Sequence, residues 1–253
     1  MAIDWQPLLS LLTIALVFVP AERLLPARRA PGFAWRRYLT DALHATVGGF
    51  LIRVGCLALL LVFVPAQTEV AAHWPLWLQV VLVLLVCDLM FWLAHRLFHA
   101  VPWLWEFHRI HHSSEHLDWL AAFRVHPVDQ IVNSTLIAVP ALLLGFSPEA
   151  IAIYAAVYRW HSILLHSNLS VSLGPLERLI VMPRFHHWHH AGEAEAHDRN
   201  FGGQLTVWDH LFGTLYRASE PRPAIYGIDA PPREDFAAHL LAPFATRKPT
   251  WQT

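Results

Sequence analysis

The chain has 253 residues, of which 55% are apolar and 15% are charged, and its mean hydropathy is +0.38. It is therefore more hydrophobic and less charged than a typical soluble domain, and we interpret it as a membrane protein. The formal net charge of -1 provides no basic field for nucleic acid, and two cysteines in apolar runs provide neither a disulfide framework nor a thiolate metal site. Histidine is the exception in this composition, because its 18 copies equal lysine and arginine combined.

Three apolar runs occupy the first part of the chain, at residues 7–20, 43–65 and 76–94. A helix needs about 20 apolar residues to cross a hydrocarbon core of about 30 Å, so the second and third runs are long enough and the first is short. The segment 21–40 carries five arginines, whereas the segment 66–75 carries neither arginine nor lysine. Because cytoplasmic loops are rich in these residues, we predict a cytoplasmic position for residues 21–40 and an external N-terminus.

Two more apolar runs, at residues 130–145 and 149–166, flank the sequence "GFSPE", whose glycine and proline indicate a turn. They predict a helical hairpin that either spans the membrane or re-enters it. Such a hairpin returns the chain to its starting side, so the segments before and after it share the cytoplasmic compartment. The expected fold is therefore an all-α integral membrane bundle of about three spans plus the hairpin, with a cytoplasmic helical cap.

Histidines gather in three short segments, "HRLFH", "FHRIHH" and "FHHWHH". In the first segment, two histidines four residues apart are separated by about 40° on a helix and therefore share one face. In each of the other two segments, histidines at positions i, i+3 and i+4 fit within an arc of about 100°. His187 falls outside this arc and is a weaker candidate. The clustered histidines are His95 and His99, then His108, His111 and His112, and finally His186, His189 and His190.

Eight imidazoles exceed the roughly four ligands of a zinc ion or the roughly six of an iron ion, so their number indicates two metal ions. A ninth candidate is His166 at the cytoplasmic end of the hairpin, and His161 is a further candidate that lies about 140° away from it on a helix. Neutral imidazole ligands need carboxylates nearby that orient them and balance the metal charge. Asp88 is the favoured residue for this role, because it lies two turns before His95 on nearly the same helical face. The other carboxylate candidates are Asp118, Asp129 and Asp198, and Asn200 is expected near the site as a residue that ties the cap together.

In chain order, the segments "DLMFWLAHRLFH", "LWEFHRIHHSS", "RVHP", "HSNL", "RFHHWHH" and "NFGGQLTVWDHLFGTLY" resemble the successive signatures of the fatty acid hydroxylase superfamily, also called sterol desaturase-like. The resemblance covers residues 85–217. It implies an integral membrane, helical, non-haem di-iron enzyme that hydroxylates, desaturates or oxidatively cleaves lipid-like molecules. The family's histidine boxes fall on the eight clustered histidines and on His166 in "HSN". Related members carry a further ligand a few residues earlier, where this chain has Ser162 and, one position before it, His161.

The resemblance also implies two iron ions as cofactors, which zinc is able to replace in purified protein, and O2 as co-substrate. The substrate would be a lipid-like small molecule that enters from the surrounding membrane lipids. Electrons would come from a separate ferredoxin or reductase, because the sequence has no dinucleotide fingerprint and no cysteine-ligated cluster. The expected enzyme is thus an O2-dependent oxidoreductase of a bacterial inner membrane, with its histidine site facing the cytoplasm.

These interpretations divide the chain into three parts. Residues 1–75 would form the N-terminal membrane spans with their basic cytoplasmic loop, residues 76–217 the catalytic region, and residues 218–253 a cytoplasmic tail. The division follows the position of the motifs, since the histidine segments and the signatures around them all lie in the middle part.

Two other functions fit parts of this sequence. The segment "HSSEH", from His112 to His116, matches the H-x-x-E-H signature of zinc metallopeptidases, with Glu115 as the base that would activate a zinc-bound water. That assignment would leave the other histidine segments without a role. A membrane protein that binds metal for storage, transport or sensing, without catalysis, is the second alternative.

Overall fold

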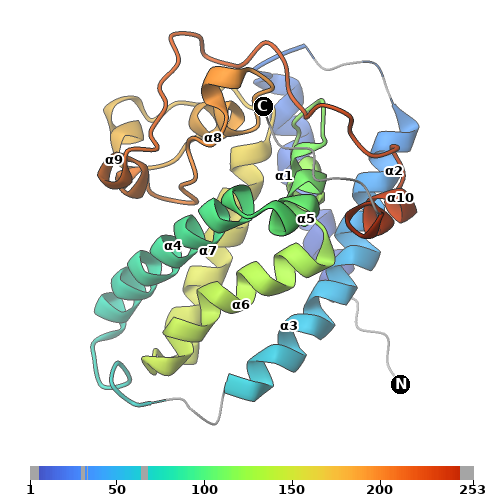
Figure 1. Cartoon of the computed structure of the whole chain (residues 1–253). Helices are drawn as coiled ribbons and strands as arrows, with labels where there is room; N and C mark the ends of the chain where they lie inside the picture. Colours follow the sequence, from blue (N-terminus) through green and yellow to red (C-terminus); the bar gives the residue numbers. More distant parts are fainter. Residues whose placement is uncertain (1–5, 30–31, 33, 64–67, 246–253) are drawn as a thin grey trace.

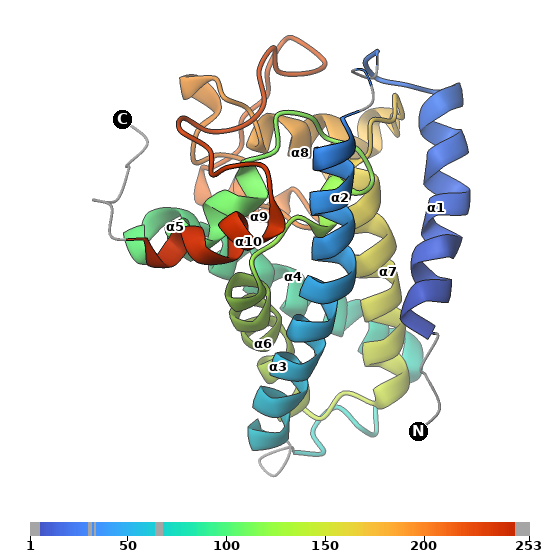
Figure 2. The ribbon, with the colours of Figure 1, turned by 90° about the vertical axis from the view of Figure 1, so that its right-hand side faces the viewer.

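The computed structural model describes residues 6–29, 32, 34–63 and 68–245. Within this part of the chain the regular secondary structure is helical, and extended segments pair only through isolated bridges without forming a sheet. Long helices stand side by side as a bundle, and shorter helices and loops cover one end of it (Figures 1 and 2). The predicted all-α class is therefore confirmed for the described residues.

The bundle is built from helices that alternate in direction along the chain (Figures 1 and 2). They are α1 (Gln6–Leu24), α2 (Trp35–Leu43), which continues through a π-helical turn (His44–Gly48) into α3 (Gly49–Phe63), then α4 (Leu76–Ala100), α6 (Pro127–Leu143) and α7 (Pro148–His166). The helix α4 packs against both α6 and α7 through buried residues that include Val83, Ile137 and Tyr154. This packing places the end of α4, which carries the first histidine segment, beside the ends of its neighbours.

The covering layer, which we call the cap, consists of short elements. They are α5 (Pro102–His112), α8 (Pro183–His189), α9 (Val207–Phe212), α10 (Phe236–Leu241) and 3₁₀ turns at Ala121–Phe123, Gly174–Arg178, Ala194–Ala196 and Ala242–Phe244. Both α5 and α8 begin with a proline, at Pro102 and Pro183, where its fixed φ angle and missing N–H suit the start of a helix. These two prolines therefore define where two of the histidine-bearing helices begin.

Within the described residues, two helices are long and apolar enough to cross a membrane, Trp35–Phe63 and Leu76–Ala100. They contain the second and third apolar runs of the sequence. In the most apolar window of Trp35–Phe63 only 6% of the residues are buried, so its leucine, valine and phenylalanine side chains face outward. Apolar surface of this kind is typical of a helix that contacts lipid.

The expected helical hairpin is present as α6 and α7, which are joined at residues 144–147. Gly145 has a φ of 72°, and a Cβ atom there would lie 2.0 Å from the carbonyl oxygen of Thr68, so this turn requires glycine. The side chain of Ser147 accepts a hydrogen bond from the backbone N–H of Ala150 at 3.2 Å and caps α7. The hairpin reverses at the end of the bundle opposite the cap and then returns the chain to it (Figures 1 and 2).

Candidate metal centre

Nine histidines meet where the cap covers the bundle, and they form two groups. Within each group, one ring nitrogen of every histidine lies within 4.8 Å of those of the others. The first group contains His95, His99, His108, His112 and His189, and the second contains His111, His166, His186 and His190. The structure thus brings together all nine residues that the sequence spacing and the family resemblance indicated.

Each histidine triplet is divided between the two groups. The helix α5 places the i, i+4 pair His108 and His112 in the first group and His111 in the second. The α8 region does the reverse, because its i, i+4 pair joins the second group and His189 joins the first. The first group is completed from the end of α4, and the second from the end of α7. The helix α5 and the α8 region therefore each contribute histidines to both groups.

Four rings of the first group are anchored through Nδ1, which donates a hydrogen bond to an oxygen atom in each case. The pairs are His95 with the Phe201 carbonyl (2.9 Å), His189 with the Arg199 carbonyl (2.8 Å), His108 with the Asp129 carboxylate (2.8 Å) and His99 with the Asp198 carboxylate (3.2 Å). Because Nδ1 carries the hydrogen, Nε2 presents a lone pair. Asp129 and Asp198 therefore lie where the sequence analysis expected carboxylates, each beside a histidine.

In the second group, two ring nitrogens face each other without a hydrogen between them. His111 Nδ1 donates to the carbonyl of Arg124 at 3.1 Å, and His166 Nδ1 donates to the carbonyl of Ser162 at 2.7 Å. Their Nε2 atoms therefore carry no hydrogen, yet they lie 3.0 Å apart. Two lone pairs at this distance repel each other unless a cation binds both. The arrangement fits a metal ion.

The first group shows the same pattern. The Nε2 atoms of His95 and His108 lie 3.1 Å apart, and those of His99, His112 and His189 are buried without a hydrogen-bonding partner among the described residues. A buried polar atom left unpaired costs about 1–3 kcal/mol, so such a concentration of them calls for a ligand. Neutral imidazole nitrogens suit zinc, iron and copper. The donor sets of both groups therefore fit metal ions.

Burial favours the neutral, metal-binding form of three imidazoles of the cap, His112, His189 and His190, because it lowers their pKa values. It lowers the pKa of His189 to about 3. Burial first, and then repulsion from neighbouring imidazoles, hold the pKa values of His112 and His190 well below the usual range. A neutral ring offers its nitrogen to a metal ion without competition from a proton.

Arg124 connects the second group to the C-terminal part of the chain. Its side chain is fully buried, where Nε donates to Asp41 of α2 at 2.6 Å and the two terminal nitrogens donate to Glu234 at 2.9 and 2.8 Å. Its backbone carbonyl accepts the hydrogen bond from His111 Nδ1. A buried guanidinium needs such partners, because an unpaired buried charge is strongly destabilising. The orientation of His111 therefore depends on an ion-pair network that reaches the tail.

Asp88 occupies a different place from the one expected beside an imidazole. Its carboxylate accepts hydrogen bonds from the backbone N–H groups of Gln204 and Leu205 at 2.7 and 3.0 Å and from Nε1 of Trp208 at 2.9 Å. The backbone that leads into α9 covers this face of α4 and binds the carboxylate of Asp88, which lies two turns before His95. Asp88 therefore anchors a cap segment to the bundle.

Asp118 also differs from its expected role, because it pairs with Arg37 at 3.1 Å rather than with a histidine of either group. Asn200 binds backbone instead of a ring. Its side-chain nitrogen donates to the carbonyls of Phe185 and Tyr216 at 3.2 and 3.1 Å. Both residues therefore join segments of the chain around the site. For Asn200 this agrees with its expected role of tying the cap together, whereas the expectation that Asp118 orients an imidazole is corrected.

Three nearby histidines lie outside both groups. His161 interacts through Nε2 with the carbonyl of Val181 at 2.8 Å, so the further ligand considered at this position is not brought to the second group. His187 lies outside the groups as well, as its helical position predicted. His116, which the peptidase signature requires together with His112, does not join the first group. The described residues therefore do not assemble the zinc peptidase site.

Asp209 acts on the site indirectly, and no spacing rule points to it. Its carboxylate accepts hydrogen bonds from the backbone N–H groups of Phe201 and Gly202 at 2.9 and 2.7 Å and from Nε1 of Trp92 at 3.2 Å. These contacts hold the Phe201 carbonyl against His95. The available signal was the segment "TVWDHLFG", which belongs to the last family signature. The carbonyl acceptors themselves are backbone atoms, which residue types do not reveal.

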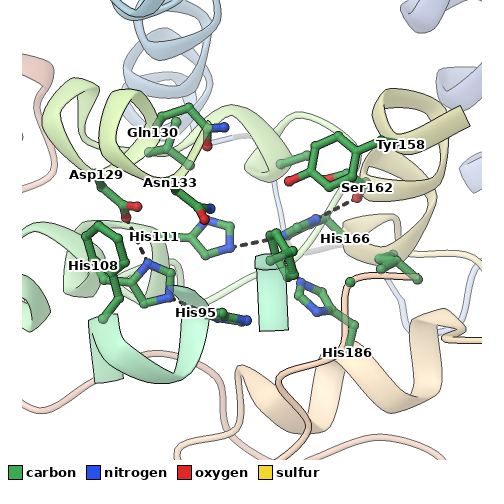
Figure 3. Close-up of a pocket in the computed structure, with 16 residues that line it drawn as sticks. His95, His108, His111, Asp129, Gln130, Asn133, Tyr158, Ser162, His166 and His186 are labelled. Carbon is green, nitrogen blue, oxygen red and sulfur yellow. Dashed lines mark hydrogen bonds and ion pairs between the residues drawn. The ribbon is translucent and has the colours of Figure 1, made fainter. Parts of the chain in front are cut away.

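A cavity of about 60 Å³ borders both histidine groups (Figure 3). Its wall includes His95 and His108 from the first group and His111, His166 and His186 from the second. Apolar side chains of α4 and α7 and polar side chains of α6 and α7 complete the wall. A small chemical group in this cavity would therefore be adjacent to both groups.

A bundle with two helices apolar enough to cross a membrane and nine histidines that converge at one end has the features of a membrane-associated protein with a histidine-rich metal site. The family model for fatty acid hydroxylases matches residues 80–214. The chain belongs to the fatty acid hydroxylase family, as its motifs predicted. No solved structure matches it.

Curated relatives carry the names of lipid-oxidising enzymes. Ornithine lipid hydroxylase OlsE of Rhizobium tropici is 30% identical over 258 aligned positions, which cover 96% of this chain and 76% of that protein. Alkylglycerol monooxygenase is 33% identical over 158 positions in Danio rerio and 32% identical over 144 in Homo sapiens. These matches cover 62% and 57% of this chain, and the chain spans about one third of those two proteins, 34% and 32%.

Hydroxylases and monooxygenases are oxidoreductases, so the expectation of an enzyme of this class is confirmed. The family and its named relatives identify the protein as a membrane lipid oxygenase. They offer no support for the peptidase or for a protein that binds metal without catalysis.

Proposed function

We propose that the nine histidines bind two iron ions, one in each group, and that these ions serve the oxidation of a lipid. The observation that carries this proposal is the cavity that borders both groups, because a substrate there would lie beside both metal sites. Iron accepts about six ligands, so groups of five and four rings leave coordination positions free. Zinc has the same preference for imidazole and would compete for these sites in purified protein.

Bound iron would supply the activation of O2 that an unactivated C–H bond requires. Hydroxylation consumes O2, two electrons and two protons, inserts one oxygen atom into the C–H bond and releases the other as water. Desaturation consumes the same reactants, removes two hydrogen atoms from the substrate and releases two water molecules. The protein binds and orients the metal through its anchored histidines, while Phe91, Phe98 and Leu165 line the cavity and limit the access of water.

We propose that the electrons come from a separate ferredoxin or reductase. The support is the sequence itself, which has two cysteines and no glycine-rich dinucleotide motif. A reduced donor would have to approach the cap, because the histidine groups lie there and electron transfer requires proximity.

We propose an ornithine lipid as the first substrate to examine, because the match to the hydroxylase OlsE extends over 96% of the chain. Alkylglycerols are the second class, since the monooxygenase relatives of Danio rerio and Homo sapiens are named for them. The substrate would enter from the bilayer, in keeping with the outward-facing apolar helices.

We propose that the histidine end of the bundle faces the cytoplasm of a bacterial inner membrane. The arginine-rich segment 21–40 contacts this end. The backbone N–H of Ala27 donates to the carbonyl of Asn168 at 2.9 Å, and Arg37 pairs with Asp118 at 3.1 Å. Because arginine-rich loops favour the cytoplasmic side, the histidines next to this segment would face the same compartment.

In this arrangement α1 and the helices Trp35–Phe63 and Leu76–Ala100 would be three spans, with the α6–α7 hairpin beside them and an external N-terminus. The proposed parts of the chain remain 1–75, 76–217 and 218–253. Residues 246–253 of the tail lie outside the described residues. A reporter fused after residue 253 should behave as cytoplasmic, and a clear external signal would overturn the orientation.

Lipid analysis of cells with and without the protein tests the activity. In cells supplied with O2 and a competent electron donor, the wild type should produce a lipid that has gained one oxygen atom or lost two hydrogen atoms. The variant His111→Ala should not, because it removes a ring of the second group. The variant His161→Gln is the matched control, since this histidine lies outside both groups. If the lipids of cells with the wild-type protein were the same as those of cells without it, the proposed function would be rejected.

A further inference from the structure

Besides its histidines and Asp129, the cavity beside the histidine groups has four polar side chains in its wall, which two helices of the bundle supply. Gln130 and Asn133 extend from α6, and Tyr158 and Ser162 extend from α7 (Figure 3). Polar side chains between membrane helices are costly and generally mark a functional pathway or site. None of these four residues belongs to either histidine group.

Asn133 is the exceptional member of this wall. Its side chain is buried, with 7% of its surface exposed, and its Oδ1 atom accepts no hydrogen bond from any described residue. The neighbouring Gln130, by contrast, donates from Nε2 to Ser134 at 2.9 Å. A buried acceptor without a partner costs about 1–3 kcal/mol, so its retention next to a cavity points to a partner supplied by a ligand.

The position of Asn133 relates it directly to the metal centre. It follows Asp129 by four residues, so both side chains lie on one face of α6. Asp129 binds His108 of the first group, and the cavity that Asn133 lines is bordered by His111 of the second. A group that donates a hydrogen bond to Asn133 would therefore lie close to the reacting atoms.

The size of the cavity limits how much of a ligand lies beside Asn133 together with the donor group. Pockets that enclose a whole ligand have volumes of about 300–1,000 Å³. A cavity of about 60 Å³ holds a few water molecules or a short segment of a lipid. Any water bound to Asn133 must leave when the substrate enters, and affinity falls unless the substrate replaces that hydrogen bond.

We propose that Asn133 positions the substrate by accepting a hydrogen bond from a hydroxyl or N–H group within a few bonds of the oxidised carbon. This inference rests on the proposed function and defines its substrate class. The enzyme would act near the polar end of a lipid that carries such a donor, and a plain hydrocarbon segment would be a poor substrate. Asn133 is thus a residue that determines specificity.

Binding of two matched lipids tests the proposal without requiring turnover. The probes are radiolabelled 1-O-hexadecylglycerol, which has free hydroxyl groups, and its di-O-methyl ether, which has none. The full-length, metal-loaded protein in lipid nanodiscs is measured without O2 or electron donor. The wild type should bind the hydroxyl lipid about tenfold more tightly than the ether, the equivalent of one good hydrogen bond.

The variant Asn133→Leu should lose this preference by weakening the binding of the hydroxyl lipid alone. Asn133→Asp, which retains an acceptor, should keep a preference. Thr135→Val is the matched control on the same helix, because Thr135 donates to the carbonyl of Ile131 at 2.7 Å and does not line the cavity. If the role of Asn133 were merely structural, Asn133→Leu would weaken the binding of both lipids equally.

Equal binding of the two lipids by the wild type, or binding of neither, would overturn the inference, as would an unchanged preference in Asn133→Leu. The outcome is independent of the proposed oxidation. If the preference holds and no lipid is oxidised in cells, the proposed function fails and the binding role stands. If lipids are oxidised and no preference is found, the reverse conclusion follows.

Discussion

Replacement of Asp129 by asparagine should weaken metal binding at the first histidine group and leave the second group intact. The carboxylate accepts the hydrogen of His108 Nδ1 at 2.8 Å, and both side chains are almost completely buried. Asparagine has the same shape and still offers an acceptor, so the hydrogen stays on Nδ1. It lacks the negative charge that makes the ring a more basic ligand.

The loss of such a partner typically lowers metal affinity 10- to 100-fold, which corresponds to about 1.4–2.8 kcal/mol. Asp129→Asn should lie near the lower limit, at about tenfold, because an acceptor remains. Asp129→Leu should lie near the upper limit, at about 100-fold, because none remains. Titration of metal-loaded protein with a chelator measures this effect. The titration should show two steps, one for the release of metal from each histidine group. The step of the first group should move to a lower chelator concentration, and the step of the second group should not move.

Asp118→Asn is the matched control for this experiment. Asp118 is a partly buried carboxylate of the same region, but its partner is Arg37 instead of a histidine. It should leave both release steps unchanged. An unaltered titration of Asp129→Asn, or an equal shift in the control, would refute the argument that this carboxylate acts through His108.

Three further outcomes are expected. His111→Ala should lower the metal content from about two ions per chain to about one, whereas His161→Gln should not, and equal contents by metal analysis would contradict the grouping. The metal-free protein should lose stability as the pH falls from about 6.5 towards 3, because His189 has a pKa of about 3 when folded and the unfolded state then binds more protons. A flat pH profile of thermal unfolding would oppose this. Gly145→Ala should lower the unfolding temperature, since its positive φ alone costs about 1–2 kcal/mol and the new Cβ meets Thr68; an unchanged temperature would show that the turn relaxes.

Helical periodicity was enough to select the eight clustered histidines that the structure brings together, because residues at i, i+3 and i+4 share a face in any helix. His166 was indicated instead by its place at the end of the hairpin and by the family motif. The periodicity could not predict how these histidines divide between the two groups. His108 and His111 are close on α5, yet they belong to different groups, since the neighbouring helices approach from different sides. That division depends on the packing of α4, α7 and α8, which sequence spacing does not contain.

Asp88 illustrates a second limit. Its helical face was predicted from its spacing to His95. In the structure, a backbone segment near Gln204, far away in the sequence, binds the carboxylate in place of a histidine ring. The same limit applies to the carbonyl groups of Phe201 and Arg199, which orient two histidines. Every residue has a carbonyl group, so only the folded chain reveals which ones contact a ring.

The network around Arg124 has a consequence for the order in which the protein matures. A ribosome makes the histidine segments before it makes Glu234, so a growing chain has the rings of both groups while Arg124 still lacks one of its carboxylates. Until the tail is released and docks, the carbonyl that orients His111 belongs to a loop with an incomplete ion pair. Full-length chains should therefore acquire metal in the second group after synthesis ends, and chains cut short before residue 234 should acquire it poorly.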